Sequence, residues 1–172
     1  MDFIGIDPSL HYTGLVHLAD SGVEARTIVT RPRLPLGSRL LRLRQELLVW
    51  LEGKPPSLVF IEGPSYNSES KKHTLGAAWG TVLTVLAERG FTYRDIPPLL
   101  LKKFVTGNTA ATKPDMAAGL EAHFNLKFAD EHQVDAAGLA LLARAVETGS
   151  WYRRCEGEVV QGLRQDRLRK PK

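Results

Sequence analysis

FIGIDPSLHYTG, residues 3–14, is an apolar run that stops abruptly at an acid. Phe3, Ile4 and Ile6 have the composition of a buried strand, and Asp7, a proline and a turn follow at once. A carboxylate at the end of a buried strand is costly unless a cation lies beside it. A metal ion, a metal-bound nucleotide or a lysine side chain would each meet that need.

The rest of the chain predicts a mixed sheet around this first strand. Residues 13–19 and 23–29 are two further strand-length segments at close spacing, which indicates an antiparallel meander. Residues 57–62 and 91–96 predict two more strands. Apolar residues at helical spacing and helix-end signals predict five helices. The first runs from Ser38, its N-cap, to Gly53, and the second from Leu75 to before Gly90. The others cover 99–105, a segment that begins at Pro114, and Glu131 to Glu147. This order predicts an α/β fold, a five-stranded mixed sheet with helices on both faces.

Length and composition indicate one soluble domain. The 172 residues are 43% hydrophobic, and no apolar stretch approaches the roughly 20 residues of a membrane span. A strand begins almost at the first residue, so no signal peptide is expected. The single cysteine, Cys155, excludes an internal disulfide and favours a reducing cytoplasm. We expect a folded domain over residues 1–150 and a detachable, partly disordered basic tail over 151–172.

The charge distribution points to a polyanionic partner. The net charge is +4 and the isoelectric point is near 9.3. The excess is concentrated after Trp151, in Arg153, Arg154, Arg164, Arg167, Arg169, Lys170 and Lys172. Nucleic acid is the simplest partner for such a tail, and a solvated tail without any partner is the alternative.

A second acid ends a second strand. The segment SLVFIE, residues 57–62, closes on Glu62 as the first strand closes on Asp7. If the two strands are neighbours, the carboxylates meet at one rim and either share a proton or bind a divalent cation. A turn-forming or helix-capping role for each acid is the alternative.

The last predicted helix adds two more candidate ligands. In ADEHQVDAAGLALLA, residues 129–143, His132 and Asp135 are one helical turn apart and share a face. Ala136, Ala137 and Gly138 would let this helix approach the sheet closely. Ordinary charge placement at a helix N-terminus is the alternative. Three carboxylates and an imidazole suit Mg²⁺ or Mn²⁺ better than zinc, and two such ions with a bridging carboxylate cleave phosphodiesters.

Two polar segments are candidate DNA contacts. The loop before the helix at Leu75 places Tyr66 and Asn67 ahead of Lys71 and Lys72, which suits stacking and phosphate contacts, although these lysines can equally be the exposed start of the helix. The segment KKFVTGNTAATK, residues 102–113, is rich in hydroxyls, amides and lysines. Its candidates for gripping phosphates are Lys102, Lys103, Thr106, Asn108 and Lys113.

Four segments resemble the motif blocks of the RuvC family of Holliday junction resolvases. They are GIDPSLHYTG, VFIEGP, LKKFVTGNTAATK and HQVDAAGLALLA, in the family's order and at similar spacing over about residues 3–150. The resemblance implies an RNase H-like fold, a homodimer and two Mg²⁺ ions per active site, with Mn²⁺ able to substitute. It also implies four-way branched DNA as substrate and a branch-migration motor as a further partner.

The same resemblance assigns roles to individual residues. By motif position Asp7, Glu62 and Asp135 are metal ligands, and His132 occupies a place where family members carry Asp or His. Lys102 and Lys113 match two lysines near the scissile phosphate, and Tyr66 lies near the position of an aromatic that stacks at the junction centre. Ser9 stands where a glycine is common, and residues 62–73 also depart from the bacterial housekeeping form, as in a phage-type or divergent member.

We therefore predict a structure-selective, Mg²⁺-dependent endodeoxyribonuclease of DNA recombination and repair. Its catalytic residues would be Asp7, Glu62, His132, Asp135, Lys102 and Lys113, with His132 either a metal ligand or the group that orients the attacking water. A nuclease of the same fold acting on other branched DNA or on RNA–DNA hybrids is the main alternative. An actin-like ATP-binding protein and a junction-binding protein without activity are the others.

Overall fold

Five strands form one mixed sheet in the order β3-β2-β1-β4-β5. The computed structural model describes residues 1–55, 57–63 and 69–168. The strands are β1 (Phe3–Asp7), β2 (Tyr12–Ala19), β3 (Gly22–Val29), β4 (Leu58–Glu62) and β5 (Thr92–Ile96). β1, β2 and β3 are antiparallel, whereas β4 is parallel to β1 and to β5. The predicted meander and mixed sheet are confirmed.

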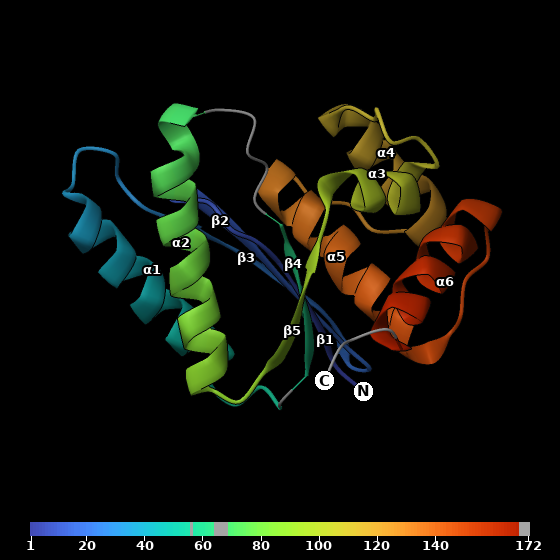
Figure 1. Cartoon of the computed structure of the whole chain (residues 1–172), viewed down its shortest axis with the longest axis horizontal. Coiled ribbons are helices and arrows are strands. Elements are labelled where there is room, and N and C mark those ends of the chain that lie inside the picture. Colours follow the sequence, from blue (N-terminus) through green and yellow to red (C-terminus); the bar gives the residue numbers. More distant parts are fainter. Residues whose placement is uncertain (56, 64–68, 169–172) are drawn as a thin grey trace.

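Helices cover both faces of the sheet, as predicted. α1 (Leu36–Leu51) and α2 (Glu69–Glu88) lie on one face, the left in Figure 1. The other face carries α3 (Pro98–Thr106), α4 (Lys113–Phe124), α5 (Glu131–Thr148) and α6 (Arg154–Leu168). Each side has its own cluster of buried apolar side chains, with Ile4 and Ile6 of β1 facing α1 and α2, and Phe3 facing α5. The central strand β1 is thus buried on both faces.

The register of the central strands brings two acids to one edge. Ile6 of β1 lies opposite Ile61 of β4, so Asp7 and Glu62 are the next residues of neighbouring parallel strands. Both strands end there because a proline follows each within two residues, and proline has no N–H for the strand ladder. The predicted meeting of the two strand ends is confirmed.

Glycines in the strands allow α5 to lie close to the sheet. A Cβ at Gly5 would lie 1.9 Å from the carbonyl oxygen of Ala136, and one at Gly14 would lie 2.0 Å from the carbonyl oxygen of His132. Gly138, expected to face the sheet, instead meets side chains of α3. The close approach therefore depends on small residues of the sheet as much as on those of the helix.

The start of α1 and the end of the chain differ from the expectation. α1 begins at Leu36 with Pro35 as its N-cap, and not with Ser38. The detachable tail is wrong for residues 154–168, because α6 buries Val159, Val160 and Leu163 in the same cluster as α3 and α5. Arginines surround this short apolar face in the sequence, so the charge pattern is more evident than the apolar one.

Among the described residues, no helix is long and apolar enough to span a membrane.

Candidate active site

A cavity of about 560 Å³ lies where the β1 and β4 strands end. Its walls come from the sheet, from the first turns of α3 and α5, and from the start of α4. The lining residues are Asp7, Ser9, Glu62, Pro98, Leu99, Leu101, Lys102, Lys113, Met116, His132 and Asp135. The structure thus brings together all six residues expected to be catalytic, from sequence positions more than a hundred residues apart.

The two strand-end acids are packed against each other. Asp7 is only 8% exposed. Burial, followed by the neighbouring Asp7 carboxylate with its charge and hydrogen bond, raises the pKa of Glu62. Like charges so close in a desolvated site cannot both ionise without a compensating cation. Burial and the nearby Asp7 carboxylate therefore favour the protonated form of Glu62 in the metal-free protein.

The first turn of α5 delivers the other two candidate ligands. Its N-cap, Asp130, accepts a hydrogen bond from the His132 backbone N–H at 2.9 Å. The His132 Nδ1 atom lies 3.2 Å from Asp7 Oδ2, and this hydrogen bond raises the pKa of the imidazole. Burial, then the charge of Asp7, raises the pKa of Asp135 to about 6. The helix therefore directs an imidazole and a carboxyl group toward the strand-end acids.

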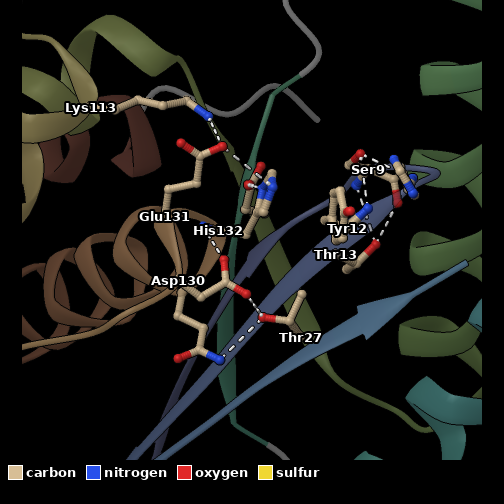
Figure 2. A network of polar contacts seen from close by, with 11 residues as sticks. Ser9, Tyr12, Thr13, Thr27, Lys113, Asp130, Glu131 and His132 are labelled. Carbon is tan, nitrogen blue, oxygen red and sulfur yellow. Dashed lines mark hydrogen bonds and ion pairs between the residues drawn. The ribbon is translucent and has the colours of Figure 1, made fainter.

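Two lysines face this acidic group. The Lys102 ammonium acts against the rise in the pKa of Glu62, as expected for a cation near that carboxyl. Lys113 Nζ binds Glu131 Oε1 at 2.6 Å (Figure 2). Partial burial lowers the pKa of Lys113, but the hydrogen bond to Glu131 and the charges of Asp135 and Asp7 give a net rise. Lys113 is thus held as a cation beside the carboxylates.

Three other candidate DNA contacts, Lys103, Thr106 and Asn108, are not among the described residues that line the cavity. Lys103 Nζ binds Glu158 of α6 at 2.8 Å. Thr106 donates to the Lys102 carbonyl oxygen, and Asn108 accepts from the Ala110 backbone N–H, so both shape the turn after α3. Outside the described residues lie Tyr66, Asn67 and the side chains of Lys71 and Lys72.

Ser9 shapes the turn that follows Asp7. Its hydroxyl oxygen accepts a hydrogen bond from the His11 backbone N–H at 3.2 Å, and its carbonyl oxygen accepts one from the Thr13 hydroxyl at 2.6 Å. Such local side-chain bonds stabilise tight turns without a glycine. Ser9 also lines the cavity, so the departure from the family pattern lies at the site itself.

The sequence interpretation missed two parts of this site. Tyr12 stacks on His132, with ring centroids 5.3 Å apart and planes inclined by 19°. The other part is an apolar wall of Pro98, Leu99, Leu101 and Met116 that lines the same cavity. A tyrosine at the start of the strand that follows Asp7 is a usable signal, whereas the wall depends on helices docking from a distant segment.

The donor set fits a hard divalent cation. Three carboxyl groups and an imidazole are oxygen and nitrogen donors of the kind that Mg²⁺ and Mn²⁺ accept. A cation would offset the burial and the repulsion that raise the carboxyl pKa values. Among the residues that the structure describes, no group of three or more His, Cys, Asp or Glu side chains converges closely enough to hold an ion as it stands. Asp7 bonds to Glu62 and His132 instead.

Comparisons with known proteins agree with this fold. Residues 3–145 match the family model described as crossover junction endodeoxyribonuclease RuvC. The Mycobacterium ulcerans protein of that name is 32% identical over 127 residues, covering 69% of this chain and 68% of the relative. The Zymomonas mobilis protein is 29% identical over 153 residues, covering 82% of this chain and 89% of the relative.

Solved structures agree as well. Thermus thermophilus RuvC matches with a TM-score of 0.71 and 28% identity, covering 87% of this chain and 97% of that one. The same protein in complex with a Holliday junction substrate matches with a TM-score of 0.72 and 27% identity, covering 82% and 91%. Fold and matches together define a nuclease with the RNase H-like fold. This chain belongs to the RuvC family of crossover junction endodeoxyribonucleases, which removes the actin-like alternative.

Proposed function

We propose that this protein resolves four-way DNA junctions as a homodimer, by one nick in each of two opposing strands. One observation carries the proposal: acids of β1, β4 and α5 and lysines of α3 and α4 meet in a single cavity. The junction is the substrate in the T. thermophilus complex, to which this chain is similar over 82% of its length. Two copies of the site are needed because each copy cuts one strand.

Metal binding is the first part of the proposed mechanism. Asp7, Glu62, His132 and Asp135 would hold two Mg²⁺ ions, or Mn²⁺ in their place. When bound, Mg²⁺ neutralises charge beside the scissile phosphate and makes water acidic enough to attack it near neutral pH. Binding would displace the proton that Glu62 tends to hold, so metal affinity should rise with pH.

The remaining steps belong to the protein's own side chains. Lys102 and Lys113 would bind the phosphate oxygens on which negative charge builds up during attack. Lys113 is prepared for this role because Glu131 already keeps it charged at the cavity. His132 would either hold metal or orient the attacking water through its second ring nitrogen, since the Nδ1 atom faces Asp7.

Substrate binding extends beyond the cavity in this proposal. Tyr66 would stack at the junction centre, and Asn67, Lys71, Lys72, Lys103, Thr106 and Asn108 would contact the DNA backbone. Such contacts hold the duplex arms without reading base sequence. We also propose that the protein works in the cytoplasm together with a branch-migration motor.

A cleavage assay with synthetic substrates tests the function. A labelled four-way junction, a flap, a fork and an RNA–DNA hybrid are incubated with the wild type in Mg²⁺, in Mn²⁺ and in EDTA. We expect paired nicks in the junction alone, only with metal, and a dimer in sedimentation analysis. Faster cleavage of the hybrid or flap would replace junction resolution with the alternative nuclease activity.

Matched variants test the site. Asp7→Asn should lower junction cleavage by about 100-fold or more, because it removes a charge from the centre of the site. Asp20→Asn is the control, since Asp20 is an exposed acid at the β2–β3 turn that pairs with the N-terminal amine. Equal nicking by the wild type and Asp7→Asn would refute the site assignment.

A further inference from the structure

We propose that Thr27 of the edge strand β3 is a positioning residue for cleavage, acting through Asp130 to hold His132 in place. The inference rests on the proposed nuclease function of the site. It concerns a residue outside the cavity, on the strand farthest from β4 and β5. Figure 2 shows that Thr27 contacts Asp130 and that Asp130 contacts His132, which links the sheet to the first turn of α5.

The Thr27 hydroxyl makes two hydrogen bonds with opposite roles. It donates to Asp130 Oδ2 at 2.6 Å and accepts from Gln133 Nε2 at 3.2 Å. A hydroxyl is suited to this because one oxygen can donate and accept together. The second Asp130 oxygen, Oδ1, accepts from the His132 backbone N–H. Thr27 therefore fixes the side chain that caps the helix at His132.

The register of the sheet explains why β3 can reach the site. Thr27 lies opposite Gly14 of β2, and Gly14 lies opposite Asp7 of β1. The three residues form one row across the sheet, so β3 presents its hydroxyl at the same level as the strand-end acid. Gly14, which touches the His132 backbone, leaves room for the helix to settle over this row.

His132 is consequently held on several sides. Its backbone oxygen rests on Gly14, its ring stacks on Tyr12, its amide binds Asp130, and its Nδ1 atom faces Asp7. The contacts with Gly14 and Asp7 belong to the fold and to the site. Thr27 touches neither the ring nor the cavity, so its effect on His132 passes through the cap.

Small displacements of such a residue matter for the reaction. Catalytic groups need placement within about 0.5 Å, and loss of an outer partner of a metal or catalytic ligand typically costs about 10–100-fold in activity or metal affinity. Without its hydroxyl partner, the Asp130 side chain can rotate and the first turn of α5 can shift. A purely structural cap would affect the unfolding midpoint and leave the turnover of folded enzyme unchanged.

The main experiment compares valine and serine at Thr27. We expect Thr27→Val, similar in shape but without the hydroxyl, to lower kcat on the four-way junction by about 10-fold or more with KM within about twofold of the wild type. Thr27→Ser restores the hydroxyl and should return kcat to within about threefold. The control is Thr148→Val, which removes an exposed hydroxyl that donates to the Arg144 carbonyl oxygen at the other end of α5.

A double variant tests the route. If Thr27 acts through Asp130, adding Thr27→Val to Asp130→Ala should lower kcat no further, because the interaction is already absent. If the kcat losses of the two single variants instead multiply in the double variant, the proposed route is overturned. A kcat of Thr27→Val within twofold of the wild type, or an equal loss in Thr27→Ser, would overturn the proposal itself.

Hydrogen exchange of the His132 amide gives a readout that needs neither metal nor substrate. We expect faster exchange in Thr27→Val than in the wild type, Thr27→Ser and Thr148→Val, at unchanged exchange in the strands. Unchanged exchange at His132 would contradict the proposal even if no substrate were cleaved. Absence of junction cleavage by the wild type would refute the proposed function instead, so the two failures are distinguishable.

Discussion

Replacing Asp135 by asparagine should make the metal-free protein more stable while abolishing cleavage. Asp135 lies in the cavity, where burial and then the Asp7 charge raise its pKa from 3.8 to about 6. The folded state thus holds this proton more tightly than the unfolded chain does. The contribution of this proton to stability is present at acid pH. It is lost as the pH rises from 3.8, the ordinary pKa, through about 6, the pKa in the folded state.

The size of the effect follows from that shift. A difference of about two pKa units corresponds to about 3 kcal/mol at pH 7, because each unit is worth about 1.4 kcal/mol. For a chain of this size, a change of 1 kcal/mol moves the unfolding midpoint by about 2–4 °C. Asp135→Asn, which never carries the charge, should therefore unfold up to about 6–12 °C higher than the wild type at pH 7, with a near-zero difference at pH 4.

Thermal unfolding followed by circular dichroism measures this difference. Both proteins are melted in EDTA from pH 4 to pH 8, with Asp20→Asn as the control for removing an exposed acid. Added Mg²⁺ should raise the midpoint of the wild type more than that of Asp135→Asn, since only a bound ion stabilises the folded state. A variant less stable than the wild type at pH 7, or a difference independent of pH, would refute the reasoning.

Three further predictions concern the helices and the chain end. Gly5→Ala should lower the free energy of unfolding in urea by more than about 3 kcal/mol, because its Cβ would meet backbone of α5, while Gly76→Ala, in open space on α2, should not destabilise. Lys113→Gln should slow single-turnover cleavage by about 100-fold at unchanged stability; an equal rate would exclude it from the reaction. Truncation after Leu168 removes three cations and should reduce the salt dependence of DNA binding by up to about three counterions. An unchanged slope of DNA affinity against salt concentration would exclude the terminal cations from binding. Truncation after Trp151 should instead unfold the chain.

The sequence predicts the sheet and the acids well because both depend on local signals. Short apolar runs that end at Asp7 and Glu62 mark strands and their exits, and the spacing of His132 and Asp135 marks one face of a helix. Strand pairing then places Asp7 and Glu62 at one edge of the sheet. The packing of α5 on the sheet brings His132 and Asp135 to the same cavity. The family motifs add Lys102, which the local pattern places only on a helix.

The features that escaped prediction depend on contacts between distant segments. Thr27 is an ordinary strand residue until Asp130 is seen beside it, 103 positions later in the chain. Gly5 looks like a neutral member of an apolar run, although the helix contact makes it irreplaceable. α6 was interpreted as a tail because net charge dominates its sequence, while the few buried residues that dock it have no obvious partner before α3 and α5 are placed.

The docking of α6 sets a lower limit on the length of a working enzyme. The match to the family model ends at residue 145, yet Arg153 donates hydrogen bonds to the Phe104 and Val105 carbonyl oxygens at the end of α3. Cutting the chain at the boundary of the likeness would leave those acceptors and an apolar strip of α5 in water. Because α3 carries Lys102, a nuclease cut at residue 145 would lose the contacts that support the helix we propose to bind phosphate.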